Sequence, residues 1–183
     1  MLLLYSPGVS EAENEPISGQ TRLMKMIFLF DKELKKDFSK SNNVEDSAFP
    51  QFKAYDYGPY APAVYADLEW LVNMEFVEAF EAGSGEIAEE EKKEFDYWSA
   101  TGSADGDVDV EQIGKSFKLS ERGMRFMKKM LPDWELTDTQ WEILREFKSR
   151  CNEASLRALL RYVYNRYPEM TEKSRIKDEI FGI

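Results

Sequence analysis

The chain has 183 residues, of which 43% are hydrophobic and 14% aromatic, and it carries a formal net charge of −11. These values are typical of a globular protein with a substantial core rather than of a disordered chain. The chain has no His and a single Cys, Cys151, which excludes Ser-His-Asp and Cys-His catalysis, the usual zinc sites and an intramolecular disulfide.

The charges are divided unevenly along the chain. Residues 1–114 contain nine basic and 24 acidic side chains, whereas residues 115–183 contain 15 basic and 11 acidic ones. Within the first part, residues 54–91 carry ten carboxylates and neither Lys nor Arg. Contact with a polyanion is therefore expected only in the last third, and a basic partner surface further forward.

No segment of the sequence predicts a membrane anchor. The apolar run at 1–5 is too short for a signal peptide and follows no basic region. The next longest apolar run, residues 26–30, cannot cross a bilayer. We therefore expect a cytoplasmic protein without a membrane partner, and the single thiol is consistent with a reducing compartment.

The first predicted elements are helical. An apolar helical end at 2–5 and an acidic loop at 11–15 precede a helix that begins near Ser18 or Thr21, both suitable N-caps. One face of this helix carries Leu23, Ile27, Phe30 and Leu34, and the other sides carry Met24, Met26, Phe28 and Leu29. This pattern predicts a central helix that is buried over much of its surface. The polar residues 35–47 predict a loop.

A short extended segment and a second helix are expected next. Residues 49–57 are rich in aromatic side chains and predict the extended segment, and Gly58-Pro59 predicts a turn. Pro62 is suited to the first position of a helix over 62–76. Residues 77–119 then predict an elongated acidic wing, with a strand around residues 95–98 and a returning strand at 116–119.

Helices are predicted for the remainder. Ser120 caps a helix that ends at Pro132, and Thr137 with Gln140 forms a capping-box pattern before the next helix. Apolar residues at 156, 159, 160, 163 and 167 predict a further helix before Pro168, and a last short helix is expected around 176–180. The expected fold is mainly α (α+β): a single domain with a winged-helix-like part at 1–131 and a helical extension at 132–183.

Three segments resemble a known family. Residues 17–25 (ISGQTRLMK), 52–60 (FKAYDYGPY) and 164–174 (YNRYPEMTEKS) are similar to segments of the YwgA and SocA-like family, also called the Panacea antitoxin domain. The resemblance implies a mostly helical, winged-helix-like domain without known catalysis, found in antitoxins, protease adaptors and neighbours of mobile elements. It supplies no catalytic, metal or cofactor residues, and the acidic wing matches none of the family's patterns.

The strongest candidate for partner binding surrounds the Gly-Pro turn. Tyrosines beside a rigid turn offer a large contact area with little side-chain entropy to lose. The preferred interpretation, however, is that these rings pack on the helix at 62–76 and the turn only directs the chain, with Tyr60 or Tyr65 left exposed if both interpretations hold. The candidate residues are Tyr55, Asp56, Tyr57, Gly58, Pro59, Tyr60 and Tyr65.

Two groups of cations are candidates for anion binding. Arg22 and Lys25 lie one helical turn apart near a helix start, where an anion can bind, but ordinary solvated charges or ion pairs with Asp31 or Asp56 are the preferred interpretation. The alternative nucleic-acid face consists of Lys115, Lys118, Arg122, Arg125, Lys128 and Lys129, and more basic residues follow at 145, 148, 150, 157, 161 and 166. These cations equally serve to neutralise the acidic part of the same chain.

Residues 105–111 alternate carboxylates in a way that suggests a calcium site, but they depart from the EF-hand order, so a solvated loop is preferred. We therefore expect a non-enzymatic protein-interaction module, antitoxin-like or protease-adaptor-like, without cofactor or metal. It would bind a basic partner through the turn at 55–60, the face of helix 62–76, or the acidic wing. The alternatives are a winged-helix transcriptional regulator that binds DNA through its C-terminal basic residues, and a DNA mimic.

Overall fold

A computed structural model describes residues 1–42, 49–81, 92–93, 96 and 114–182 of the chain. The first half contains α1 (Leu2–Tyr5), β1 (Ile17–Ser18), α2 (Gln20–Leu29), the π-helix η1 (Phe30–Leu34), α3 (Lys35–Asn42), β2 (Lys53–Tyr55), β3 (Gly58–Tyr60) and α4 (Pro62–Asn73). The second half contains β4 (Val77–Glu81), β5 (Lys115–Leu119), α6 (Glu121–Trp134), α7 (Asp138–Glu153), α8 (Leu156–Arg166), the 3-10 helix η4 (Pro168–Thr171) and α9 (Lys177–Phe181). The prediction of a mainly helical α+β chain with a small sheet is confirmed.

The strands form two small antiparallel sheets. The larger has the order β1-β5-β4, in which Ile17 lies opposite Phe117 and Val77 lies opposite Leu119. The smaller is the hairpin β2–β3. The returning strand predicted at 116–119 is confirmed as β5. Most of the predicted acidic wing lies outside the described residues, including the alternating carboxylates at 105–111 and, apart from Asp96, the strand predicted around 95–98.

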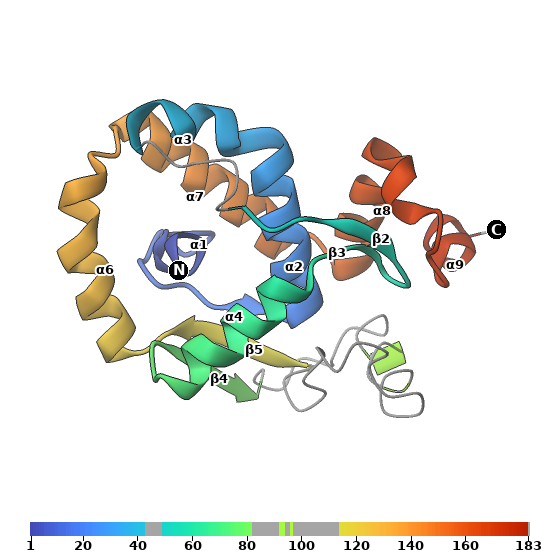
Figure 1. The fold of residues 1–183 in the computed structure, drawn as a ribbon, viewed down its shortest axis with the longest axis horizontal. Helices are drawn as coiled ribbons and strands as arrows, with labels where there is room; N and C mark the ends of the chain where they lie inside the picture. Colours follow the sequence, from blue (N-terminus) through green and yellow to red (C-terminus); the bar gives the residue numbers. More distant parts are fainter. Residues whose placement is uncertain (43–48, 82–91, 94–95, 97–113, 183) are drawn as a thin grey trace.

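The short helix α1 is surrounded by other helices. In Figure 1, α1 lies within a ring formed by α2, α3, α4 and α6, while the hairpin β2–β3 lies beside α8 and η4. One cluster of buried side chains contains residues of α1, α2, β5, α7 and α8. The C-terminal helices therefore share a core with the N-terminal elements.

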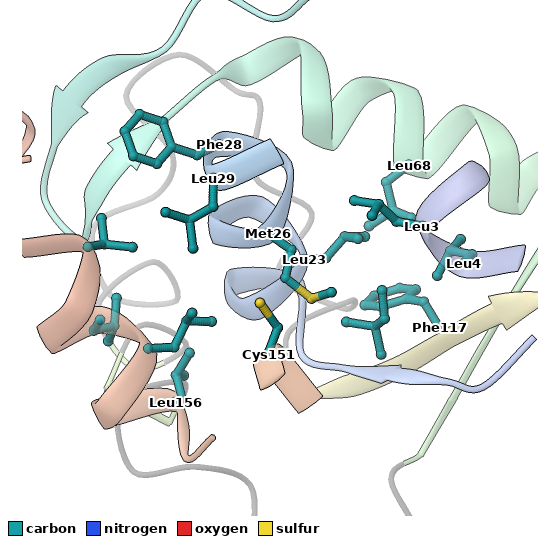
Figure 2. Packing of buried hydrophobic residues seen from close by; sticks show 14 of the residues in the cluster. Leu3, Leu4, Leu23, Met26, Phe28, Leu29, Leu68, Phe117, Cys151 and Leu156 are labelled. Atoms are coloured by element: carbon teal, nitrogen blue, oxygen red, sulfur yellow. The ribbon is translucent and has the colours of Figure 1, made fainter. Parts of the chain in front are cut away.

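The predicted central position of α2 is confirmed. Met24, Met26 and Phe28 are inaccessible to solvent, and Figure 2 shows side chains of α1, β5 and α7 packed around this helix. Burying apolar side chains on nearly every side of a helix is worth about 2 kcal/mol per side chain, so α2 organises the core. The N-cap is Gly19, with φ of 90°, instead of Ser18 or Thr21.

The loop predicted at 35–47 is wrong over residues 35–42, which form α3. Helix formation continues through η1 because α3 has tertiary partners that its polar sequence does not reveal. The ring of Phe38 is buried and lies 5.2 Å from that of Phe30. The side-chain Nε2 of Gln140, in α7, donates to the carbonyl of Asp37 at 2.7 Å. These contacts outweigh the weak helical propensity of the segment.

The turn predicted at Gly58-Pro59 is displaced. The turn residues are Asp56 and Tyr57, while Gly58 and Pro59 belong to β3, and Tyr55 lies opposite Gly58 in the register. Asp56 and Tyr57 connect the strands, and Gly58, which follows them, adopts a φ of +85°, which side-chain-bearing residues rarely reach. The predicted start of α4 at Pro62 is confirmed, and the helix ends at Asn73.

The predicted caps of the C-terminal helices are confirmed. The Ser120 hydroxyl accepts from the N–H of Gly123, and Thr137 with Gln140 forms a reciprocal capping box. The predicted stop at Pro132 is wrong, since α6 continues to Trp134. Pro132 removes one backbone donor, but it lies on the exposed side of the helix, where water can bind the carbonyl left unpaired.

Candidate functional site

The tyrosine-rich segment at 55–60 is mostly buried. Tyr57, Tyr60 and Tyr65 are between 5% and 7% exposed, and Tyr55 is half-buried. The Tyr55 and Tyr60 rings stack at 4.8 Å, and the Tyr60 and Tyr65 rings meet edge to face at 5.5 Å. Neither Tyr60 nor Tyr65 is exposed, so the combined possibility, in which one of them stays on the surface, does not hold. These rings bury apolar area inside the fold, as the interpretation preferred from the sequence expected.

Two polar contacts and one close packing contact hold the same segment. The ammonium of Lys25, in α2, donates to the carbonyl of Pro59 at 3.0 Å. Arg175, after η4, forms an ion pair with Asp56 at 3.2 Å and donates its backbone N–H to the Asp56 carbonyl. Gly58 lies so close to Tyr164 of α8 that an added Cβ would be 2.7 Å from the Tyr164 ring. The hairpin thus joins α2, α8 and the C-terminal segment.

Arg22 and Lys25 do not form the predicted anion site. The Arg22 guanidinium donates to the carbonyls of Ser18, Cys151 and Ala154, the last at 2.7 Å. The carbonyls of Cys151 and Ala154 lie at the C-terminal end of α7, where a cation stabilises the unpaired oxygens of the helix. Lys25 is 3% exposed and directed to Pro59. Both cations stabilise backbone carbonyl groups.

Other basic residues of the C-terminal third have the same role. Lys148 is inaccessible to solvent and donates to the carbonyls of Leu4 and Ser6, at the end of α1. Its pKa is lowered to about 8, because burial penalises the charged form more than Glu15 favours it. Arg161 donates to the carbonyl of Ile180, at the end of α9. These cations are therefore occupied within the fold.

The alternative nucleic-acid face is also engaged in part. Lys118 pairs with Glu78 at 3.2 Å, Lys128 with Glu13 at 3.7 Å, and Arg125 with Glu121 on its own helix at 3.6 Å. Lys115 lies on β5, and Lys129 is exposed on α6. The pairs with Glu13 and Glu78 support neutralisation of the acidic part of the chain by the basic part.

Arg122, the remaining member of that set, leads to a surface cluster that the sequence did not predict. Its guanidinium carbon lies 4.6 Å from the centre of the Phe76 ring. The same ring meets Phe126 edge to face at 5.3 Å and lies parallel to Trp70 at 6.3 Å. We call Trp70, Met74, Phe76, Arg122 and Phe126 the aromatic patch.

Much of the aromatic patch is open to solvent. Trp70 is 57% exposed, Phe126 is 41% exposed and Met74 is 39% exposed. Isolated apolar side chains on a surface are ordinary, whereas adjacent aromatic rings beside Arg are the composition of protein-binding hot spots. Cation–π and ring contacts hold these side chains in fixed positions, which reduces the entropy lost on binding.

The backbone brings the two halves of the patch together. The buried face of α4 carries Val64 and Leu68, so Trp70 projects to the opposite side. The N-terminus of α6 approaches the end of α4 so closely that a Cβ on Gly123 would lie 2.1 Å from the Phe76 carbonyl oxygen. Sequence reasoning named the face of helix 62–76 as one of three partner surfaces. In the sequence, the one signal of this surface was Trp70, a large apolar residue among the polar positions of the helix. Its proximity to Phe126 could not be predicted from the sequence.

Within the described residues, no group of three or more Cys, Asp or Glu side chains is arranged to hold a metal ion. Across the same residues, no helix combines the length and apolar character needed to span a membrane. Comparisons of the chain with models of protein families, with curated proteins and with solved structures found no match.

Proposed function

We propose that this chain is a non-enzymatic protein-interaction module, antitoxin-like or adaptor-like, which binds a protein partner through the aromatic patch. The observation that carries the proposal is the 57% exposure of Trp70 beside the rings of Phe76 and Phe126. A partner that buries these rings would gain apolar area without having to order them first. The module would act in the cytoplasm by occluding its partner or delivering it to another protein.

A winged-helix-like scaffold is part of the proposal. The succession of β1, the helices α2 and α4, and the strands β4 and β5, with the sheet order β1-β5-β4, supports such a scaffold. In it, α4 takes the place of the helix that reads DNA in a regulator. The resemblance of residues 17–25, 52–60 and 164–174 to the YwgA and SocA-like family supports the same scaffold and an antitoxin-like role.

Charge favours protein over DNA at α4. No Lys or Arg lies between residues 54 and 91, and the exposed residues of α4 and its C-terminal turn include Asp67, Glu69 and Glu75. Affinity for DNA depends on neutralising phosphates with cations, so this face would repel a duplex. The partner proposed here presents an apolar side chain to Trp70 and basic residues to the carboxylates of α4.

The test begins with a partner captured by the tagged chain from cells and then purified on its own. Isothermal titration with the reconstituted pair should show that Trp70→Ala or Phe126→Ala weakens binding at least about tenfold, as expected for a hot spot. Tyr162→Ala is the matched control, because Tyr162 is an exposed aromatic residue on α8 and should leave the affinity within about twofold.

Two outcomes would contradict the proposal. The first is a purified partner whose affinity is unchanged by both patch substitutions. The second is tight, sequence-selective binding of duplex DNA with a steep dependence on salt, which would favour the transcriptional regulator. Titration of labelled duplex at low and moderate salt distinguishes this second outcome.

A further inference from the structure

An apolar cavity of about 800 Å³ lies inside the ring of helices. Its walls come from α1, α2, η1, α3, α4 and the end of α6, and include Leu3, Ile27, Leu71 and Trp134. Protein interiors are close-packed, and voids much larger than a water molecule are few. A cavity of this volume falls within the range of sites that bind small molecules.

Among the lining residues that the structure describes, the charged side chains are all acidic. These are Asp67 of α4 and Asp133 of α6; the other described side chains are apolar, and the amino group of Met1 also lies on the lining. Both carboxylate residues are exposed, so they lie where the cavity meets solvent. They approach it from different walls, which gives a negative mouth to an otherwise apolar space.

A charged group is disfavoured inside the cavity, whereas at the mouth water can still solvate it. The amino group of Met1, on the same lining, has a pKa lowered to about 6, because burial penalises its charged form more than Asp67 favours it. A ligand's cation would therefore remain beside Asp67 and Asp133, where water still reaches it, while its apolar part enters the cavity.

We propose that this cavity binds a small amphiphilic cation, with its apolar body against the leucines and aromatic rings and its protonated amine at the solvent-exposed edge that carries Asp67 and Asp133. The site is separate from the aromatic patch, although α4 and α6 contribute to both. Partner binding through Trp70 and ligand binding beside Leu71 can therefore succeed or fail independently.

Three probes with one apolar chain isolate the contribution of charge: octylamine, octanol and octanoate. Isothermal titration of the full chain at neutral pH should rank octylamine first, octanol about tenfold weaker and octanoate weakest. The preference for amine over alcohol reflects two solvent-exposed carboxylates, each of which contributes modestly. In the double variant Asp67→Asn, Asp133→Asn this preference should disappear while octanol binds as before.

Glu69→Gln is the matched control, since Glu69 is an exposed carboxylate on α4 that does not line the cavity, and it should keep the full preference. Leu71→Trp should fill the cavity and weaken octylamine and octanol alike. Methyl NMR of the unsubstituted chain locates the ligand even if that variant fails to fold, because octylamine should shift the Leu23 and Ile27 signals.

The proposal is overturned if octylamine binds no better than octanol, if the double Asn variant keeps the preference, or if the shifted methyl groups lie outside the cavity. If octylamine binds the cavity without changing the affinity for the partner protein, the result supports the ligand site and does not bear on the aromatic patch. If Trp70→Ala loses its partner but still binds octylamine, the result supports the aromatic patch and does not bear on the ligand site.

Discussion

The Lys148 ammonium donates a hydrogen bond to the Leu4 carbonyl at 2.9 Å, across 144 positions of sequence. A second bond, to the carbonyl of Ser6, has a length of 2.7 Å. Lys148 therefore attaches the C-terminal end of α1 to α7 from a position without solvent access. A buried charge in this place is stabilised by these two carbonyl dipoles and by the attraction of Glu15, which together do not offset the penalty of burial, so its protonation is coupled to folding.

The first prediction follows from the pKa of Lys148, which falls from 10.5 to about 8 in the folded chain. Between these values the unfolded chain binds more protons, so this residue makes the free energy of unfolding rise with pH. Between pH 7 and pH 11, the free energy of unfolding should rise by about 3 kcal/mol more in the unsubstituted chain than in Lys148→Met. Urea unfolding of both proteins along this pH series measures it. Parallel pH profiles would show that Lys148 is not the coupled group.

Arg22 provides the second prediction. Arg22→Ala leaves the carbonyls of Cys151 and Ala154 without their guanidinium donor and should lower the free energy of unfolding by about 2 kcal/mol. Arg150→Ala is the control, because Arg150 pairs with Glu146 on the exposed side of the same helix, where the change should stay within about 0.5 kcal/mol. Chemical denaturation compares the two. Equal effects would mean that Arg22 does not cap α7.

The third prediction separates backbone strain from steric overlap. Gly58 has a φ of +85°, and a Cβ there would lie 2.7 Å from Tyr164, whereas Gly182 has a φ of +74° with nothing within 4 Å of the added atom. Gly182→Ala should cost about 1 kcal/mol for strain alone, and Gly58→Ala about 3 kcal/mol because overlap is added. Thermal unfolding of both variants tests this difference, and a smaller loss for Gly58→Ala would contradict the packing described here.

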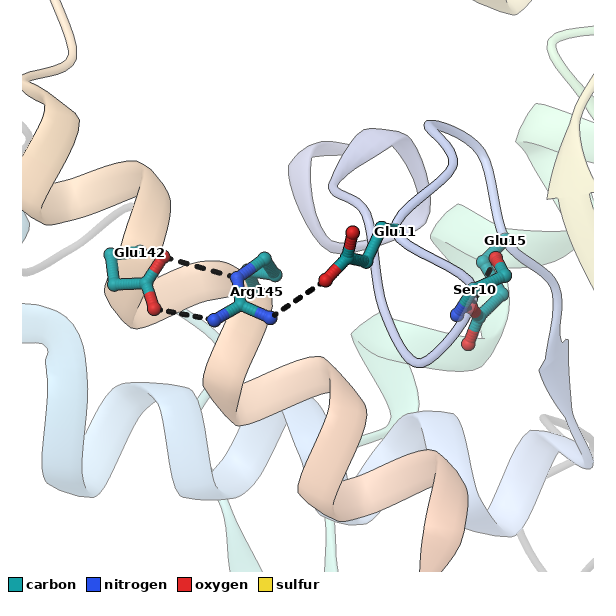
Figure 3. A network of polar contacts seen from close by, with 5 residues as sticks. All are labelled: Ser10, Glu11, Glu15, Glu142 and Arg145. Atoms are coloured by element: carbon teal, nitrogen blue, oxygen red, sulfur yellow. Dashed lines mark hydrogen bonds and ion pairs between the residues drawn. The ribbon is translucent and has the colours of Figure 1, made fainter.

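The fourth prediction concerns the loop before β1, shown with its contacts in Figure 3. Burial acts to raise the pKa of Glu15, but hydrogen bonds from Ser10 and Asn152 outweigh it and lower the pKa to about 2. Because the folded chain holds the ionised carboxylate more strongly than the unfolded chain does, Glu15 stabilises the fold above pH 4.5. This stabilisation is lost as the pH falls toward 2. After allowance for screening by solvent, Glu15→Gln should cost about 1 kcal/mol at pH 7 and nothing at pH 2.

Glu11, in the same loop, serves as its control. Glu11 is exposed and lies 3.9 Å from Arg145, which also pairs with Glu142. Glu11→Gln removes only this exposed ion pair, so it should change the free energy of unfolding at pH 7 by less than about 0.5 kcal/mol. If the two substitutions altered the acid profile equally, general charge repulsion would explain it better than the Ser10 and Asn152 contacts.

The sequence alone determined the elements whose signals are local. The caps at Ser120 and Thr137, the start of α4 at Pro62 and the burial of α2 follow from hydrogen bonds and periodicity within a few residues. The charge division also follows from composition, and it supplied the argument against DNA at α4. Its physical basis, the need for cations at a phosphate backbone, requires no coordinates.

Only the tertiary structure decided where the polar and aromatic side chains lie. A cation such as Arg22 or Lys148 looks solvated in sequence, because most of the carbonyls that accept its hydrogen bonds lie more than a hundred positions away. Tyr60 was a candidate for a contact surface, but packing against Met24 of α2 and Val64 of α4 buries it, and Trp70 gained Phe126 as a neighbour only through the approach of α6. Burial and long-range hydrogen bonds depend on the whole fold, so local patterns do not determine them.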